Sequence, residues 1–536
     1  MKKLLVILSL LFCTTAYAQE GLKQVEIRDF SGGMSSNILA DLLQPNQSAS
    51  MVNISLSRHG KLEKRKGQAL FVEDVTDMAS TVTFTGIGRF DPDANTSYLV
   101  AASGYDIIRA QSGDSTWTQA SGTDVMTTGK TTEFVQANDL LFILNGFDPT
   151  SWYDGSTFTK ASTYPASPPT ASTGAWLRNY LFLAGATAEN DWIYFSNNLE
   201  PKVFDASDII KINTGDGQKI QHLEPFRLNE LIIYKERSIF VLDIAGAVLS
   251  GWTVQPISVV VGTTAPRSVV SLGNDQWFLS SNPVAIRSLA RTQFDKILVN
   301  EVSSPIQDIF DGTGAIALNK TQMGRSAAIL FDDKYLLAIP TGTSTVNNTV
   351  VVHDFRNQSW YLITGWYPRD WVLFDERLFY IDENDGRVVE CFTGTDGDLP
   401  PGPDEWLKAS TSSQAIDYEY ISRFLDFDSQ INFKQPDAVS VEFDPTGNYE
   451  AIVSVNMDQN GWASIGSVNL AGNSLTLDFT LPDYLGRSGI TRKTFQIQDK
   501  GEFKEMQVKV SNTASQQSVI LQRINVFARP RPWRRE

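Results

Sequence analysis

Seven short apolar runs, each introduced by Asn or Asp, constrain the fold of this chain more than any other feature. They begin at Asn95, Asn138, Asn179, Asn229, Asn274, Asp332 and Asp375, with successive spacings of 43, 41, 50, 45, 58 and 43 residues. Each run, such as NDLLFILNG, places consecutive apolar residues after a turn signal, which is typical of a strand buried on both faces. A period of roughly 40–50 residues predicts the blades of a β-propeller, about six to eight of them, over residues 70–398. An array of β-sandwiches is the alternative.

The segment after the propeller marks a domain boundary. Residues 399–406, LPPGPDEW, are rich in proline, which interrupts strands, and predict a linker. Residues 407–528 hold about seven alternating segments at short spacing, among them SLTLDFTL at 474–481, which predict an antiparallel β-sandwich. We therefore expect an all-β chain, a multi-bladed β-propeller followed by a C-terminal antiparallel β-sandwich. Residues 529–536 form a basic tail, expected to be disordered or, alternatively, an arm that docks on an acidic neighbour.

The N-terminal residues predict export. Residues 1–18 combine two lysines, an apolar run and the sequence AYA, as in a signal peptide that is cleaved after Ala18. The run is too short to span a bilayer, and no later stretch is long enough, so we expect no transmembrane span. Residues 19–69 are expected to form an extended segment ahead of the propeller.

The charge of the chain bears on nucleic-acid binding. Cleavage removes Lys2 and Lys3 and no acid, so the formal net charge changes from −16 to −18. Such an acidic chain is unsuited to binding nucleic acid through counterion release. It suits a surface that DNA passes without sticking, although a generic acidic protein has the same charge.

The sequence shows no recognisable catalytic or metal-binding motif. His59, His222 and His353 lie far apart, and lone histidines are more often structural than catalytic. Two acid-rich segments lack the rest of a calcium loop and predict tight turns: DPD at 91–93 and DENDG at 382–386. We predict no catalytic residue, no cofactor, no metal site and no enzymatic activity.

A glycan-directed propeller is the main competing interpretation. The sequence SGDSTW at 112–117 resembles the sialidase box but lacks its glycine and is not repeated in other blades. Trp152, Trp192 and Trp366 could stack on sugars, although tryptophans of this kind more often belong to a blade core. On this interpretation the chain is an exported bacterial β-propeller that binds or cleaves a surface glycan or protein.

The stretch from Ile27 to Gly67 contains seven residues, mostly glycine and other turn-forming types, at spacings that form a recognisable pattern. These are Gly32, Gly33, Pro45, Asn53, Gly60, Arg65 and Gly67. The pattern resembles the N-terminal signature of the β-propeller tail nozzle and tail hub (packaged-DNA-stabilisation) proteins of tailed bacteriophages. There, a double glycine precedes a Pro/Asn/Gln turn, an Asn-containing strand and G-x-L-x-x-R-x-G. The GDGQKI turn at 215–220 and the YKERSI strand at 234–239 are similar to the middle of the same proteins.

The resemblance implies a structural role in the virion. Proteins of this family form closed homo-oligomeric rings at the end of the phage tail and attach to adaptor or tail fibre proteins. DNA passes transiently through the ring, without sequence-specific binding. The family provides no catalytic residue, and the seven signature positions are the only site residues that it implies.

The signal peptide departs from this family, whose members assemble in the cytoplasm. Three explanations compete. The true start codon lies downstream, the phage exports or tethers this protein, or the gene encodes a secreted bacterial propeller. The expected localisation is the virion tail, and the signal peptide also implies export to the periplasm or outside the cell.

Overall fold

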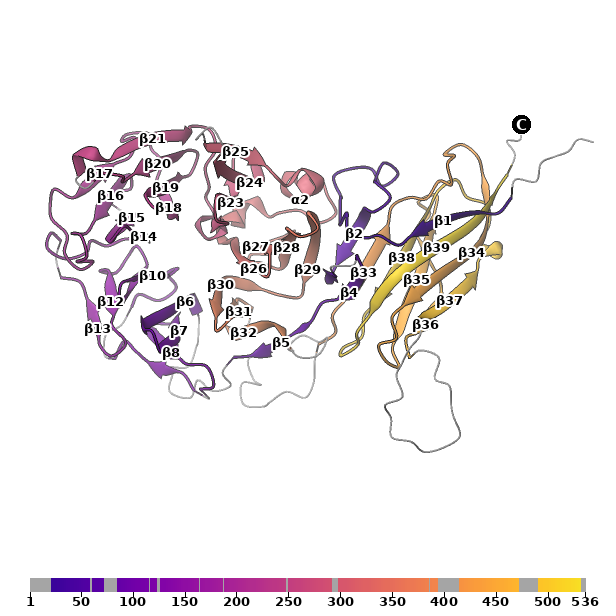
Figure 1. The fold of residues 1–536 in the computed structure, drawn as a ribbon, viewed down its shortest axis with the longest axis horizontal. Coiled ribbons are helices and arrows are strands. Elements are labelled where there is room, and N and C mark those ends of the chain that lie inside the picture. Colours follow the sequence, from indigo (N-terminus) through magenta and orange to yellow (C-terminus); the bar gives the residue numbers. More distant parts are fainter. Residues whose placement is uncertain are drawn as a thin grey trace, which may run out of the picture.

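Strands account for nearly all regular structure, and they form two bodies side by side (Figure 1). The computed structural model describes residues 21–57, 60–71, 84–114, 116–122, 126–162, 164–186, 188–246, 249–291, 297–384, 386–393, 414–471 and 490–531. A β-propeller is followed by an antiparallel β-sandwich, so the predicted fold class is confirmed. The predicted signal peptide and the linker at 399–406 lie outside the described residues.

The propeller has seven four-stranded blades around a common axis. Blade 1 consists of β6 (Phe84–Asp93), β7 (Thr96–Ser103), β8 (Asp106–Ala110) and β9 (Thr118–Gln119). Blade 2 consists of β10 (Glu133–Ala137), β11 (Leu140–Leu144), β12 (Ser151–Tyr153) and β13 (Phe158–Lys160). Blade 3 consists of β14 (Thr173–Leu177), β15 (Tyr180–Ala184), β16 (Trp192–Phe195) and β17 (Ile209–Lys211). Blade 4 consists of β18 (Ile220–Phe226), β19 (Glu230–Lys235), β20 (Ile239–Asp243) and β21 (Thr253–Ser258). Blade 5 consists of β22 (Val270–Ser271), β23 (Asp275–Ser281), β24 (Val284–Arg291) and β25 (Ile297–Glu301). Blade 6 consists of β26 (Ala327–Phe331), β27 (Lys334–Ile339), β28 (Thr349–Asp354) and β29 (Ser359–Thr364). Blade 7 consists of β30 (Pro368–Phe374), β31 (Arg377–Asp382), β32 (Val388–Thr393) and β5 (Gly67–Leu70).

Each of the seven apolar runs supplies the second strand of one blade, from β7 to β31. These strands lie inside a sheet whose two faces pack on neighbouring blades, so both faces need apolar side chains. All five residues of β11 and all six of β27 are buried. Helical segments are short: η1 (Leu249–Gly251), η2 (Pro266–Ser268), η3 (Ser304–Ile306), α2 (Gln307–Asp311), η4 (Lys320–Arg325) and η6 (Gln498–Lys500).

The ring of blades is closed by a strand from the N-terminal segment. β5 pairs with β32, joining Leu70 to Val389, and so becomes the outer strand of blade 7. The inner strand of that blade, β30, packs against β6 of blade 1. Chain segments more than three hundred residues apart in sequence therefore share one blade.

The sandwich also contains strands from both ends of the chain. One layer continues the sheet of blade 6 in the order β29, β2 (Ser48–Val52), β33 (Tyr418–Ser422), β38 (Met506–Asn512), β35 (Glu450–Met457) and β36 (Trp462–Asn469). The other layer has the order β3 (Ile54–Leu56), β4 (Leu62–Lys64), β39 (Ile520–Pro530), β34 (Lys434–Phe443) and β37 (Thr491–Gln496), and β1 (Lys23–Ile27) pairs with β39. Apolar side chains of both layers fill the space between them.

The structure revises two expectations about domain limits. Residues 19–69 were expected to precede the propeller as an extended segment, but β1 to β4 complete the sandwich and β5 completes blade 7. Strand β39 runs to Pro530, so the basic tail expected from residue 529 begins inside a paired strand. Within the part of the chain that the structure describes, no helix has the length and apolar character needed to cross a membrane.

Candidate functional site

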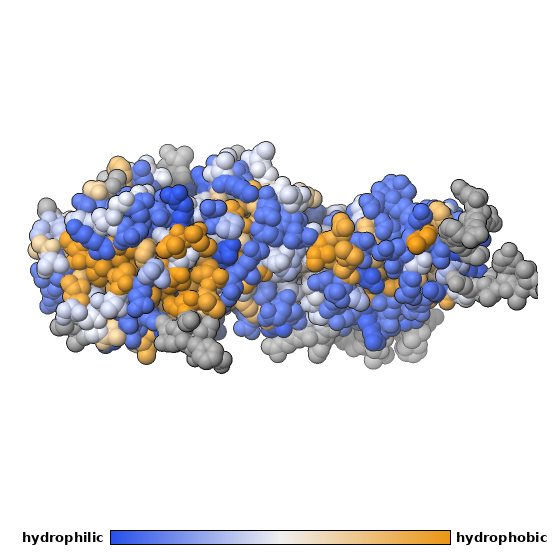
Figure 2. All heavy atoms as spheres, turned by 90° about the horizontal axis from the view of Figure 1, so that it is seen from above, coloured by the Kyte–Doolittle hydropathy of each residue, from blue (hydrophilic) through white to orange (hydrophobic). Residues whose placement is uncertain are grey.

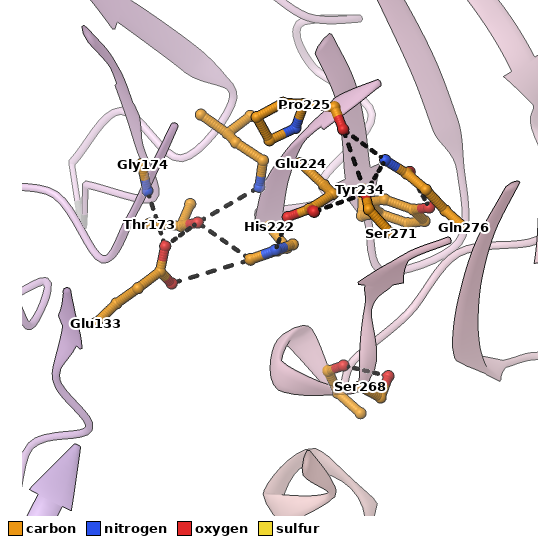
Figure 3. A network of polar contacts seen from close by, with 12 residues as sticks. Glu133, Thr173, Gly174, His222, Glu224, Pro225, Tyr234, Ser268, Ser271 and Gln276 are labelled. Atoms are coloured by element: carbon orange, nitrogen blue, oxygen red, sulfur yellow. Dashed lines mark hydrogen bonds and ion pairs between the residues drawn. The ribbon is translucent and has the colours of Figure 1, made fainter. Parts of the chain in front are cut away.

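A cavity of about 420 Å³, lined by both polar and apolar residues, lies at the centre of the propeller, between the inner strands of its blades. The inner strands of blades 1 to 4 and blade 7 line it together with η2. Figure 3 shows polar contacts among residues of blades 2 to 5 in and beside the cavity. The inner strand of each blade has one edge that borders the central space, so its polar side chains can reach that space. The second strand is paired on both edges and lies farther from the axis. Chemistry-bearing groups are therefore concentrated in this cavity.

His222 lies between two glutamates in this cavity (Figure 3). Its Nε2 is 3.3 Å from Glu224 Oε2, and its Nδ1 is 3.9 Å from Glu133 Oε2 and 3.3 Å from Thr173 Oγ1. His222 and Glu224 share a face of β18 because alternate residues of a strand point the same way. Glu133 comes from β10 and Thr173 from β14, so three blades contribute to one cluster.

The hydrogen-bond pattern around His222 fits the imidazolium form, in which both ring nitrogens donate. Thr173 Oγ1 gives its hydrogen to Glu133 Oε1 and also accepts from Leu223 N, so it can only accept from Nδ1 of His222. A carboxylate at Glu224 likewise requires Nε2 to donate. Burial lowers the pKa of His222, but the hydrogen bond to Glu224 and the charge of Glu133 outweigh burial and raise this pKa overall.

Glu133 is held in an unusual electrostatic position. Burial raises its pKa, and the charge of His222 together with the N–H of Gly174 opposes that rise only in part. Its Oε1 accepts hydrogen bonds from Thr173 Oγ1 and Gly174 N, both 3.1 Å away. The carboxylate is thus fixed in place by donors from β14 and presents its second oxygen to the cavity.

Glu224 is anchored in the same way from blade 5. Ser271 Oγ donates to Glu224 Oε1 at 2.8 Å, and Gln276 Nε2 donates to Ser271 Oγ at 3.1 Å. The hydroxyl of Tyr234, deep in the blade core, donates to Gln276 Oε1 at 2.9 Å. The position of Glu224 is therefore set by a chain of hydrogen bonds that ends in buried structure (Figure 3).

Arg267 spans the propeller axis. From η2 it donates through Nη2 to the carbonyl oxygens of Thr132 at 2.9 Å and Thr85 at 3.0 Å, which belong to the blade 1–2 side. Its Nη1 lies 3.5 Å from Asp370 Oδ2 on β30. Burial raises the pKa of Asp370, and Arg267 partly offsets this effect. One guanidinium thus ties blade 5 to blades 1, 2 and 7 across the centre.

The seven signature residues lie elsewhere, and two of them meet at the junction of the two bodies. Asn53 Nδ2 donates to Thr364 Oγ1 of blade 6 at 2.9 Å and to the Asp417 carbonyl, next to β33, at 2.8 Å. Arg65 donates through Nε to Asn53 Oδ1 at 2.8 Å and through Nη2 to the Thr364 carbonyl at 3.0 Å. Its guanidinium stacks 4.6 Å from the ring centroid of Trp366. The junction is therefore built on a buried arginine.

The glycines and the proline of the signature shape the chain around this junction. Gly33 has φ of 66° and packs so closely that a Cβ would lie 2.6 Å from Ser359 Cβ, at the start of β29. Gly32 has no space for a side chain either, because of Asn46. Pro45 lies in the turn closed by Gln47 N and Gln44 O. Gly60 lies in the turn before β4, and Gly67 begins β5.

The GDGQKI and YKERSI segments also have a structural explanation. Asp216 accepts two hydrogen bonds of 2.8 Å from Nζ of Lys235, whose side chain is fully buried. Gln218 Oε1 accepts from Arg237 N and from Ser238 Oγ. The turn before β18 is thereby fastened to the turn between β19 and β20.

The remaining sequence candidates occupy structural positions. Trp366 is fully buried, and Trp152 and Trp192 are half-buried beneath Lys202 and Lys211. The tight turn predicted at 91–93 falls at Ala94 and Asn95 instead, because Asp91 and Asp93 belong to β6. Glu383 and Asn384 of the other acid-rich segment do lie in a turn, and Asp385 lies outside the described residues. The carboxylates of Asp91, Asp93 and Asp382 accept hydrogen bonds from Arg89, Asn95 and Asn384.

The absence of a metal centre holds for the described ranges only. There, no group of three or more His, Cys, Asp or Glu side chains is arranged to hold a metal ion. Cys391 is buried in blade 7, and His59 lies outside the described residues.

Sequence reasoning missed the cavity because its residues come from separate blades. His222 looked isolated, although the pair His222 and Glu224, two residues apart on a strand, places an acid and an imidazole on one face. That spacing is the only local signal. The approach of Glu133 and Arg267 depends on how the blades close.

Comparisons with known proteins add little beyond the fold. No protein-family model and no curated protein matches the chain. Among solved structures, it is similar to YCF48 from Cyanidioschyzon merolae, with a TM-score of 0.41 and 13% identity over 61% of this chain and 98% of that chain. The Pan2 WD40 domain of Neurospora crassa gives a TM-score of 0.38 and 8% identity over 62% and 96% of the two chains. The fold assignment rests on the seven blades of the chain itself.

Proposed function

We propose that this chain is a non-enzymatic structural subunit of a phage tail, in a nozzle or hub ring from which DNA leaves. The proposal comes from the resemblance of residues 27–67 and of the segments at 215–220 and 234–239 to such proteins. The observation that carries it furthest is the junction, where the signature residues Asn53 and Arg65 bind both bodies. A subunit that transmits force along a tail needs such a rigid connection.

The path of DNA would lie between subunits in this proposal. Arg267 crosses the axis of the propeller itself, so the propeller channel is obstructed. The DNA channel is instead the centre of a closed ring of copies. The charge of −18 on the processed chain favours sliding of DNA past this surface over binding.

Two exposed apolar patches are candidates for contacts between subunits. Figure 2 looks onto the propeller rim that carries β21 and shows hydrophobic residues gathered there. Exposed side chains of this region, which we call the rim patch, are Leu249, Val254, Val259, Val260 and Leu298. The loop patch, between β1 and β2, consists of Ile38, Leu39 and Leu42. Exposed patches of this kind often mark interfaces, and a contact between two different patches generates a ring when its rotation closes.

The absolute mass of the chain from Gln19 onward, with negative-stain images of the same sample, tests this proposal. We expect a closed ring of several copies. The double variant Val259→Asp/Val260→Asp should give monomers, because it places charge in the rim patch. Leu228→Asp is the matched control, since Leu228 is 84% exposed in the turn between β18 and β19. A wild-type monomer at every concentration, also in the presence of the adaptor protein, would contradict the ring.

An exported propeller that binds or cleaves a surface glycan or protein is the second candidate. The acid-lined cavity and the predicted signal peptide favour it. This candidate requires a monomer whose ligand binding depends on the axial cavity. The mass measurement therefore separates the two proposals before any ligand is known.

A further inference from the structure

The two glutamates of the axial cavity are built alike. Each is anchored through Oε1 by fixed donors, Glu133 by Thr173 and Gly174 and Glu224 by Ser271. Each presents Oε2 to His222 from opposite sides, at 3.9 Å and 3.3 Å. Oε2 of Glu133 is beyond hydrogen-bonding distance of His222, so this oxygen can accept a further donor. The cluster thus offers two converging carboxylate oxygens.

The charge of the cavity favours a cationic occupant. Its lining carries three carboxylates, those of Glu133, Glu224 and Asp370. Arg267 donates to backbone carbonyls and pairs with Asp370, and its charge also lowers the pKa of Glu133. The three carboxylates are therefore opposed by the guanidinium of Arg267 and by the proton on His222, and of these two the proton can be exchanged for another cation.

The size and the apolar part of the lining restrict the cation further. A volume of about 420 Å³ exceeds that of a bare ion and lies within the range of roughly 300–1,000 Å³ usual for organic ligands. Ile87, Ala175 and Leu223 provide apolar surface beside the carboxylates. An alkyl chain that ends in several N–H donors satisfies both parts of this lining.

We propose that the axial cavity is a binding site for an alkyl guanidinium or alkyl ammonium group. Oε2 of Glu133 and Oε2 of Glu224 accept its hydrogen bonds, and His222 releases a proton when the group enters. Such a group has two sources, a free small molecule or a basic side chain of a protein. The C-terminal arginines Arg534 and Arg535 of a second copy are one protein source, since Arg529 and Arg531 already pair with Asp437 and Glu502. The site exists whether or not the chain forms a ring.

Binding at this site must depend on pH. The groups that face His222 are Glu224 on its own strand, Glu133 on β10 and Thr173 on β14, with Arg267 and Asp370 further along the lining. The glutamates raise the pKa of His222, so the imidazole is cationic below that pKa and competes with the ligand. Affinity should therefore increase as the pH rises through the pKa of His222 and level off above it.

N-butylguanidinium is the first probe, with N-butylurea as its neutral isostere. Titration calorimetry and ligand-observed NMR should show saturable binding of the guanidinium and none of the urea. Glu133→Gln/Glu224→Gln should weaken binding at least tenfold, because it removes both charges. Glu301→Gln, on the outer strand of blade 5, is the matched control and should leave the affinity unchanged. Absence of saturable binding to the wild type, or equal affinity in the glutamine variant, would overturn the proposal.

His222→Gln tests the site without changing a carboxylate. The variant loses the competing proton, so it should bind N-butylguanidinium more tightly than the wild type below the His222 pKa. It should lose the part of the pH dependence that comes from the imidazole and keep the part that comes from Glu133, whose pKa is raised by burial. A cluster with a purely structural role would show no such gain. Circular dichroism confirms that each variant is folded before titration.

A peptide distinguishes the two sources. The nine residues from Ala528 to Glu536, ARPRPWRRE, are compared with the same peptide carrying citrulline in place of each arginine. Tighter binding of the arginine peptide than of N-butylguanidinium, lost in Glu133→Gln/Glu224→Gln, assigns the site to a protein side chain. Binding of N-butylguanidinium alone assigns it to small molecules. If neither probe binds, the proposal is wrong.

Discussion

His353 is a neutral histidine enclosed by aromatic rings. Its ring centroid lies 4.5–4.9 Å from those of Trp277, Phe355 and Trp360, and burial lowers its pKa to about 4. In the unfolded chain the pKa is near 6.5, so unfolding takes up a proton between these two values. Stability should therefore fall as the pH drops from about 6.5 to 4, by about 3 kcal/mol from this residue.

Urea unfolding at several pH values checks this prediction. His353→Phe keeps an aromatic ring and should flatten the pH dependence over this interval, whereas Leu228→Ser, at an exposed turn position that carries no titratable group, should not. An unchanged slope in His353→Phe would show that another group causes the acid sensitivity.

At the scale of single elements, blade spacing depends on small residues in inner strands. A Cβ on Gly86 of β6 would lie 2.0 Å from the carbonyl oxygen of Thr132, just before β10. Gly86→Ala should destabilise the propeller by about 3 kcal/mol or more, because the contact is backbone and cannot rotate away. Gly104→Ala, in the same blade with open space around it, should cost only about 1 kcal/mol for its positive φ. Thermal unfolding of both variants measures the difference, and equal losses would contradict the steric explanation.

The elements also show what could be predicted from the sequence. The second strands were found because both of their faces are buried, which leaves a continuous apolar run. Inner strands such as β6 and β18 contain glycine, acidic residues or histidine, because one edge of the strand borders the propeller axis. In the sequence, this mixed composition is the same as that of a loop, so the strands were not recognised. The alternating pattern does not predict strand β36, because half of its residues are exposed and only one is buried. The predicted strand SLTLDFTL, at 474–481, lies outside the described residues. The axial cluster was unpredictable because its members meet only when three blades close.

At the scale of the whole molecule, Arg65 determines whether the two bodies unfold together. Arg65→Met removes the donors to Asn53 Oδ1 and to the Thr364 carbonyl oxygen in a buried site, while Asn53 Oδ1 keeps its hydrogen bond from Thr364 N. We expect a loss of about 2–4 kcal/mol and a single calorimetric transition that separates into two. Lys66→Met changes the exposed neighbour and should keep one transition. One unsplit transition in Arg65→Met would show that the shared sheet alone couples the bodies.

The pairing of β5 with β32 has a consequence for synthesis. A ribosome makes β5 before any blade and β32 after all the others, so the first strand waits unpaired until the last blade emerges. Every product that terminates before β32 therefore retains an open sheet edge, which recruits other chains or proteases. Only a chain translated through β32 hides that edge, and the closing strand thereby distinguishes a finished propeller from an incomplete one.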